Sequence, residues 1–132
     1  MERVFLDANV LFSAAYKSTR LRLLWKLPDV QLVSSTYAVR EAELNLEQIR
    51  PEAIGELTEL LKKVEILSFA NLEPLPSSIS LVEKDVPILQ AAIVTKATHL
   101  LTGDVRHFGN LFGVTVAGVV VLPPGEFLKG KD

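Results

Sequence analysis

Four acidic residues stand where their carboxylates could act together. Asp7 directly follows a short apolar run, and Asp104 follows another after a single glycine. Asp85 precedes a strongly apolar segment, and Glu41 lies in the second turn of a stretch with helical periodicity. In a parallel sheet, the strand exits and the starts of the following helices share one edge, where ligand sites of α/β proteins lie. We therefore expect these four carboxylates to converge on one rim of a sheet.

A divalent cation would offset the repulsion among these carboxylates. The chain has no cysteine, and its two histidines are not paired. Hard oxygen ligands without cysteine or paired histidine select Mg²⁺ or Mn²⁺ over zinc. The residues therefore predict a Mg²⁺ or Mn²⁺ site with Asp7, Glu41, Asp85 and Asp104 as candidate ligands.

The same acids have plainer interpretations. Each Asp could instead cap the N-terminus of a helix, because its oxygens accept unpaired backbone N–H groups there and favour the helix dipole. Glu41 is too far into its helix to be a cap, but a lone helical Glu is usually a solvated surface charge. Glu43 flanks the apolar stripe of that helix at a similar angle. Periodicity alone therefore leaves the choice between Glu41 and Glu43 open.

The elements that must position these acids alternate between apolar runs and helical patterns, which favours a mostly parallel sheet covered on both faces. We predict an α/β fold of three layers, α/β/α, around a sheet of about five strands. The expected strands are Val4–Leu6, Val30–Ser34, Val64–Phe69, His99–Thr102 and Val116–Leu122. The expected helices are Val10–Tyr16, Thr19–Lys26, Thr36–Gln48 with Ser35 as its N-cap, a helix opened by Pro51, Val86–Ala97, and a C-terminal turn at Glu126–Leu128; Asn71–Ser80 is expected to be a loop.

Length and composition place limits on the class of protein. A chain of 132 residues, 48% of them hydrophobic, suits one domain over residues 1–132. No signal peptide is apparent, and the longest apolar stretch is far short of the ~20 residues that span a bilayer. We therefore expect a cytoplasmic protein without a membrane partner. The net charge of −2 weakly opposes nucleic-acid binding through the global field.

The order and spacing of these segments resemble the PIN-domain family, which includes the VapC-type toxins of prokaryotic toxin–antitoxin pairs. The resemblance covers essentially the whole chain. The segments that carry it are Val4-Phe5-Leu6-Asp7-Ala8-Asn9-Val10-Leu11, Ser35-Thr36-Tyr37-Ala38-Val39-Arg40-Glu41, Lys84-Asp85-Val86-Pro87-Ile88-Leu89-Gln90-Ala91-Ala92, Leu100-Leu101-Thr102-Gly103-Asp104-Val105-Arg106-His107-Phe108, and the ending Val121-Leu122-Pro123-Pro124-Gly125-Glu126-Phe127-Leu128.

The resemblance implies a metal-dependent ribonuclease whose catalytic acids are Asp7, Glu41, Asp85 and Asp104, and it selects Glu41 over Glu43. It also implies that Asn9 and Thr102 orient Asp7 and Asp104, although Thr102 could serve only as a strand former. We interpret His107 as an ordinary surface residue rather than a general acid.

The expected partners are RNA, a possible antitoxin protein and a second copy of the chain. Tyr37 and Leu44 lie away from the core stripe of their helix and could mark a homodimer contact. Two other enzyme or signalling classes fit less well. A haloacid-dehalogenase phosphatase needs an acid at position 9, where Asn9 stands, and a receiver domain needs an acid at the end of its third strand. A PIN-like binding module without nuclease activity is the main alternative.

Overall fold

Six strands form one sheet, in the order β3-β2-β1-β4-β6-β5, in a computed structural model that describes residues 1–16 and 20–131. All neighbouring strands are parallel except β5 and β6, which are antiparallel. The strands are β1 (Glu2–Leu6), β2 (Val30–Ser35), β3 (Glu65–Leu67), β4 (His99–Leu101), β5 (Thr115–Val116) and β6 (Val119–Leu122).

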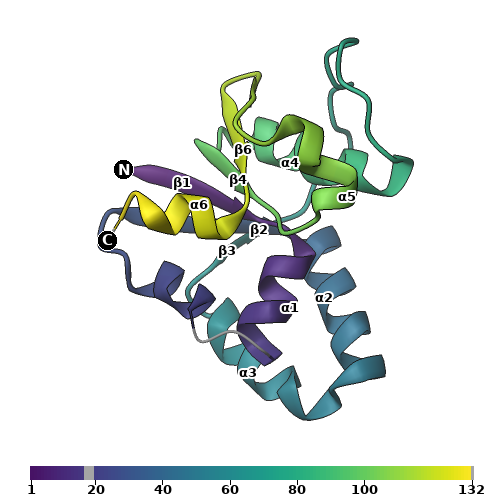
Figure 1. Cartoon of the computed structure of the whole chain (residues 1–132). Coiled ribbons are helices and arrows are strands. Elements are labelled where there is room, and N and C mark those ends of the chain that lie inside the picture. The colour runs from purple at the N-terminus through teal and green to yellow at the C-terminus, as the bar shows by residue number, and fades with distance from the viewer. Residues whose placement is uncertain (17–19, 132) are drawn as a thin grey trace.

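Helices cover both faces of this sheet, so the predicted three-layer α/β fold is confirmed. In Figure 1, α1, α2 and α3 lie below the sheet, and α4 and α5 lie above it. The α-helices are α1 (Ala8–Tyr16), α2 (Thr36–Ile49), α3 (Ile54–Leu61), α4 (Val86–Val94), α5 (Val105–Phe108) and α6 (Pro124–Lys129). Short 3₁₀ helices are η1 (Leu21–Lys26), η2 (Pro51–Ala53), η3 (Glu83–Asp85) and η4 (Gly109–Leu111).

The central strand β1 fixes where the site can form. The chain runs from β1 to β2 on one side, whereas β4 pairs with the other side of β1. The strand order therefore changes side at β1, and such a topological switch point is where α/β sheets bind ligands. Leu6 at the end of β1 is level with Leu101 at the end of β4. The residues that follow these two strands therefore leave the sheet side by side.

The C-terminal strand prediction was incomplete, because Val116–Leu122 is a hairpin rather than one strand. Ala117 and Gly118 both have positive φ, 48° and 88°. Two successive positive φ values are characteristic of the tight two-residue turns that reverse a chain within a hairpin. The chain consequently has a sixth, antiparallel strand at the edge of the sheet.

Two helix predictions also differ from the structure. The helix predicted to run to Ala97 ends at Val94, since Lys96 takes a left-handed conformation with φ of 59° and Ala97 N–H donates to Ala92 O. The segment predicted as a helix up to Lys26 is the 3₁₀ helix η1, and the predicted start at Thr19 lies outside the described residues.

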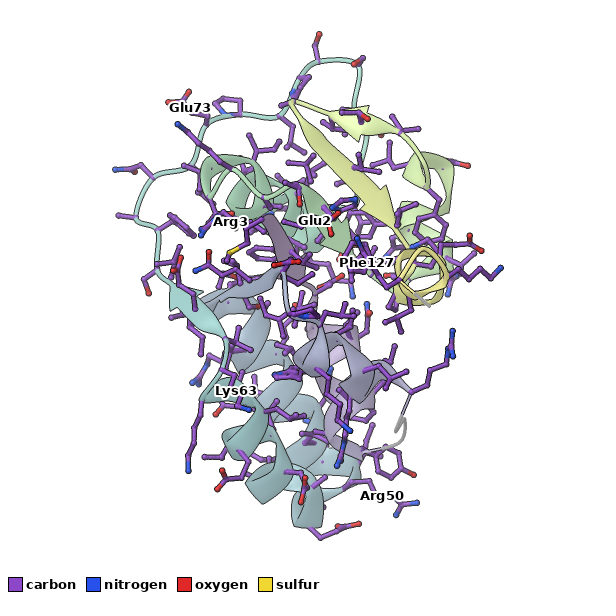
Figure 2. All side chains as sticks on the ribbon, turned by 90° about the vertical axis from the view of Figure 1, so that its left-hand side faces the viewer. Glu2, Arg3, Arg50, Lys63, Glu73 and Phe127 are labelled. Atoms are coloured by element: carbon purple, nitrogen blue, oxygen red, sulfur yellow. The ribbon has the colours of Figure 1, made fainter. Side chains whose placement is uncertain are left out.

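The amino ends of the strands are closed by polar contacts among distant segments. The Arg3 guanidinium donates to Thr95 O, to Gln31 and to Glu65. Figure 2 labels Glu2, Arg3 and Phe127 near one another on this side, where α6 approaches the start of β1. The ring of Phe127 meets His99 edge to face at 4.9 Å. Side chains therefore pack together at the amino ends of the strands, and a cleft can open at the opposite edge, where the strands have their carboxyl ends.

Among the described residues, no helix combines the length and apolar character needed to cross a membrane.

Candidate active site

A polar cleft of about 350 Å³ opens at the carboxyl edge of the sheet, where the sequence predicted a site. The structure brings all four candidate acids to its walls, from the end of β1, from α2, from η3 and from the segment after β4. The lining residues are Asp7, Ala8, Asn9, Val10, Ser13, Leu21, Glu41, Asn45, Lys84, Asp85, Gly103, Asp104 and Pro124.

Asp7 forms the floor of the cleft and is only 4% exposed. One carboxylate oxygen, Oδ1, accepts the backbone N–H of Ala8 at 2.6 Å. The other, Oδ2, accepts the hydroxyl of Thr102 at 2.8 Å and the side-chain amide of Asn9 at 3.3 Å. The carboxylate is therefore held in one orientation by three donors.

Thr102 and Asn9 join the ends of β1 and β4 in one hydrogen-bond network. The fully buried Thr102 hydroxyl donates to Asp7 and also accepts the backbone N–H of Asp104 at 3.1 Å. The Asn9 amide donates to the same hydroxyl at 3.2 Å, and its Oδ1 accepts Gly103 N–H at 2.8 Å. Both side chains thus make the contacts expected of residues that orient Asp7 and the Asp104 segment.

The Asp7 carboxyl resists ionisation in this environment. Burial raises its pKa from 3.8 to about 6, because the charged form loses its hydration. The hydrogen bonds from Thr102 and Ala8 oppose this rise, and the negative charges of Asp85 and Glu41 add to it. A nearby cation would offset both the burial and the like charges.

Asp85, Asp104 and His107 form a group of potential ligand atoms. The Nδ1 atom of His107 is 2.7 Å from Asp85 Oδ2 and 3.0 Å from Asp104 Oδ2. Asp85 Oδ2 and His107 Nδ1 are nevertheless buried without a partner in hydrogen-bond geometry. Ligand atoms of these three residues all lie within 4.8 Å of one another. Two buried polar atoms without hydrogen bonds, next to a third ligand, fit the requirements of a divalent cation.

The interpretation of His107 as an ordinary surface residue was therefore wrong. His107 lies three residues after Asp104 in the short helix α5, so one helical turn places both side chains on the same side. That spacing is a signal in the sequence, but the contact with Asp85 joins separate segments and has no local signature. The imidazole adds one nitrogen to a site that was predicted to be all oxygen.

The capping alternative applies unevenly to the three aspartates. Asp104 does cap α5, since its Oδ1 accepts His107 N–H at 3.0 Å, while its Oδ2 faces the imidazole ring. Asp85 precedes α4 but makes no capping hydrogen bond with its side chain. Asp85 is 7% exposed, so its burial is not explained by a cap.

Of the two candidate acids on α2, Glu41 lines the cleft and Glu43 does not. Asn45 lies one turn beyond Glu41 on the same helix and also lines the cleft, as does Ser13 one turn beyond Asn9. Asn45 and Ser13 were not predicted as site residues, although their four-residue spacing from Glu41 and Asn9 is a helical signal in the sequence. Lys84, the basic residue among the described ones that line the cleft, was not predicted as a site residue either.

Tyr37 lies beside these acids and remains protonated. Burial raises the pKa of its phenol above the ordinary value of 10.0, and the charge of Glu41 and a contact with that carboxylate raise it further. The charges of Asp85 and Asp7 act in the same direction. The Tyr37 hydroxyl therefore keeps its proton at neutral pH, and it donates to the backbone carbonyl of Lys84 at 2.6 Å.

Comparison with known proteins gives structural relatives only. No family model matches the sequence, and no curated protein sequence matches it. The fold is similar to a chain of VapBC2 from Rickettsia felis, solved bound to a DNA fragment from the promoter, with a TM-score of 0.65 and 15% identity over 92% of this chain and 98% of that one. It is also similar to a chain of VapBC-1 from nontypeable Haemophilus influenzae, with a TM-score of 0.60 and 16% identity over 93% of this chain and 98% of that one.

At these identities the likeness concerns the fold, and it extends over almost the whole length of each chain. The mostly parallel sheet and the helical layers on its two faces agree with the fold class predicted from the sequence. The chain has a PIN-like α/β fold.

Proposed function

We propose that this protein is a divalent-metal-dependent endoribonuclease that cleaves RNA at the acidic cleft. The observation that carries the proposal is the group of Asp85 Oδ2, His107 Nδ1 and Asp104 Oδ2, in which the first two atoms are buried and lie 2.7 Å apart without making a hydrogen bond. Carboxylates held this close together in a partly buried place are costly unless a positive charge offsets them. A phosphodiester substrate and a hydrolytic reaction use a cation of this kind directly.

Asp85, Asp104 and His107 would hold the ion, with Asp7 as the further carboxylate ligand, and Mg²⁺ or Mn²⁺ suits this donor set. A bound ion supplies charge that makes a water molecule more acidic and offsets the negative charge that builds up on the phosphate. The imidazole nitrogen favours Mn²⁺ over Mg²⁺ as the first ion to test.

The remaining groups of the cleft act around that centre. Thr102 and Asn9 hold the Asp7 carboxylate in one orientation through hydrogen bonds of 2.8 and 3.3 Å. Glu41, on the wall formed by α2, would accept a hydrogen bond from the attacking water and so direct it toward the phosphorus. The Lys84 ammonium would bind a phosphate oxygen, which matters because the other charged side chains among the described lining residues are acidic.

The structural relatives bear on partners. Both are chains of VapBC assemblies, which supports a toxin role for this chain and an antitoxin protein as its partner. We also propose a homodimer. Leu44 is 43% exposed on the outer side of α2 and is available for such a contact, whereas the Tyr37 hydroxyl is already bound within the chain.

A PIN-like module that binds nucleic acid or protein without cutting is the second candidate. The tightly connected network around Asp7 favours the nuclease, since a binding surface has no need of a buried carboxylate held by three donors.

The direct test is cleavage of a labelled RNA by the purified protein during a Mn²⁺ titration. We expect cleavage that requires Mn²⁺ and stops with EDTA. Asp7→Asn should lower the rate by at least about 100-fold, because it removes the buried charge that faces the ion. Glu43→Gln is the matched control, an acid on the wall helix that does not line the cleft, and it should cut like the wild type.

Equal cleavage by the wild type and Asp7→Asn would show that the activity comes from elsewhere and would refute the proposal. RNA that is bound but never cut, at any Mn²⁺ concentration, would favour the binding module. A DNA strand of the same sequence belongs in the same experiment, because it tests the preference for RNA.

A further inference from the structure

The hydroxyl of Tyr37 links the two walls of the acidic cleft. Tyr37 lies in the first turn of α2, one turn before Glu41, and its hydroxyl donates to the carbonyl of Lys84 at 2.6 Å. Lys84 belongs to η3, which ends at Asp85. One hydrogen bond therefore connects the helix that carries Glu41 to the short segment that carries both Lys84 and Asp85.

That segment follows a long loop. Residues 68–82 contain neither helix nor strand, and they are held to the body of the chain by apolar side chains such as Phe69 and Leu81 and by the bond from the Gln90 amide to Glu73 O. In Figure 1 part of this loop projects beyond α4. Within η3 itself, Asp85 N–H donates to Val82 O at 2.8 Å, but this bond closes only a local turn. The Asp85 side chain makes no capping hydrogen bond with α4, and its Oδ2 has no hydrogen bond. Its position is therefore set by α4, which begins at the next residue, by the His107 ring 2.7 Å away, and by where η3 is held.

We propose that Tyr37 is a positioning residue that fixes η3 against α2, so that the Asp85 carboxylate faces Asp104 and His107 and can bind the cation. The inference rests on the proposed metal site and adds a residue outside it. Tyr37 does not line the cleft, and its hydroxyl acts on η3 through the Lys84 carbonyl, while the phenol also lies in contact with the Glu41 carboxylate.

The test uses Tyr37→Phe, which removes only the hydroxyl. Its matched control is Thr36→Val, because the neighbouring Thr36 hydroxyl makes a similar exposed bond, 3.0 Å to Ser68, between α2 and the start of the same loop. Mn²⁺ affinity is measured by calorimetry without RNA, and amide hydrogen exchange of metal-free protein is measured at Asp85 and across α2 and the sheet. Tyr37→Phe should weaken Mn²⁺ binding about tenfold, as loss of a residue that orients a ligand does, and should speed exchange at Asp85 alone. Thr36→Val should change neither.

Tyr37→Phe protein that binds Mn²⁺ as tightly as the wild type would overturn the inference. So would faster exchange throughout α2 and the sheet, because the hydroxyl would then support folding rather than the position of η3. Wild-type protein that binds no Mn²⁺ would also overturn it. If the wild type binds Mn²⁺ but cuts no RNA, the proposed nuclease function fails while the role of Tyr37 stands on the binding data.

Discussion

The Asp7 carboxylate is buried among groups that both hold it and repel its charge. Three donors orient it, yet burial and the charges of Asp85 and Glu41 outweigh them and leave its pKa at about 6. The folded, metal-free protein therefore binds a proton at Asp7 more tightly than the unfolded chain does. That protonation stabilises the fold at low pH, and the stabilisation is lost as the pH rises through about 6.

This difference predicts a specific pH dependence of stability. In EDTA, lowering the pH from 7.5 to 5 should raise the free energy of unfolding of the wild type by about 1.4 kcal/mol relative to Asp7→Asn, which has no proton to gain. Urea unfolding of both proteins at the two pH values measures it, and the difference between them removes the contribution of other titrating groups. Parallel pH profiles for the two proteins would mean that Asp7 is ionised without penalty and that the cleft is better solvated than the structure indicates.

At the scale of elements, helix α2 positions Glu41, Asn45 and Tyr37 together. Ser35 begins it, and its Oγ accepts Ala38 N–H at 3.2 Å. The apolar stripe that faces the core includes Ala38, Ala42 and Leu46, all fully buried. The helix is thus held by a cap at one end and by packing along its length.

Removal of the Ser35 cap should therefore lower the stability of the protein without changing its affinity for the metal. Ser35→Ala should lower the free energy of unfolding by about 1 kcal/mol, since one N–H at the start of α2 loses its acceptor. Mn²⁺ affinity should stay within about twofold of the wild type, because the buried stripe still fixes the helix. Ser35→Thr keeps the hydroxyl and is the control. A loss of Mn²⁺ binding in Ser35→Ala alone would show that the cap, and not packing, sets the position of α2 and of its Tyr37 bond to Lys84.

Some of these helices and strands could be predicted from the sequence, and others could not. The α2 boundary and the strands β1, β2 and β4 were predictable, because a serine cap and apolar runs are local signals. The β5–β6 hairpin was not, since its turn places Ala117 at a positive φ that alanine does not favour. Helix α5 is four residues long, too short to show periodicity.

The residues of the site likewise divide into those that the sequence predicts and those that only the fold reveals. The strand exits and the resemblance predicted Asp7, Asp85 and Asp104, and the structure brings these residues together. The contact of His107 with Asp85 and the bond from Tyr37 to Lys84 each join segments that are distant in the sequence, so only the fold reveals them.

At the scale of the whole molecule, the negative charge of the chain and of its cleft means that a bound cation is needed before RNA can approach. The chain carries a net charge of −2, and among the described residues the cleft gathers four carboxylates against one lining lysine. RNA phosphates would be repelled from such a surface. A bound divalent ion would offset two of these negative charges and offer a phosphate oxygen a local positive centre, which is how an acidic protein could act on a polyanion.

The most direct test of the account is therefore to locate the ion. Crystals grown or soaked with Mn²⁺ should give an anomalous difference peak in the cleft, in contact with Asp85 and Asp104, and Asp85→Asn crystals treated in the same way should lose it. Wild-type crystals at millimolar Mn²⁺ with no peak in the cleft, or with the same peak after Asp85→Asn, would contradict the central claim that these carboxylates form a metal site.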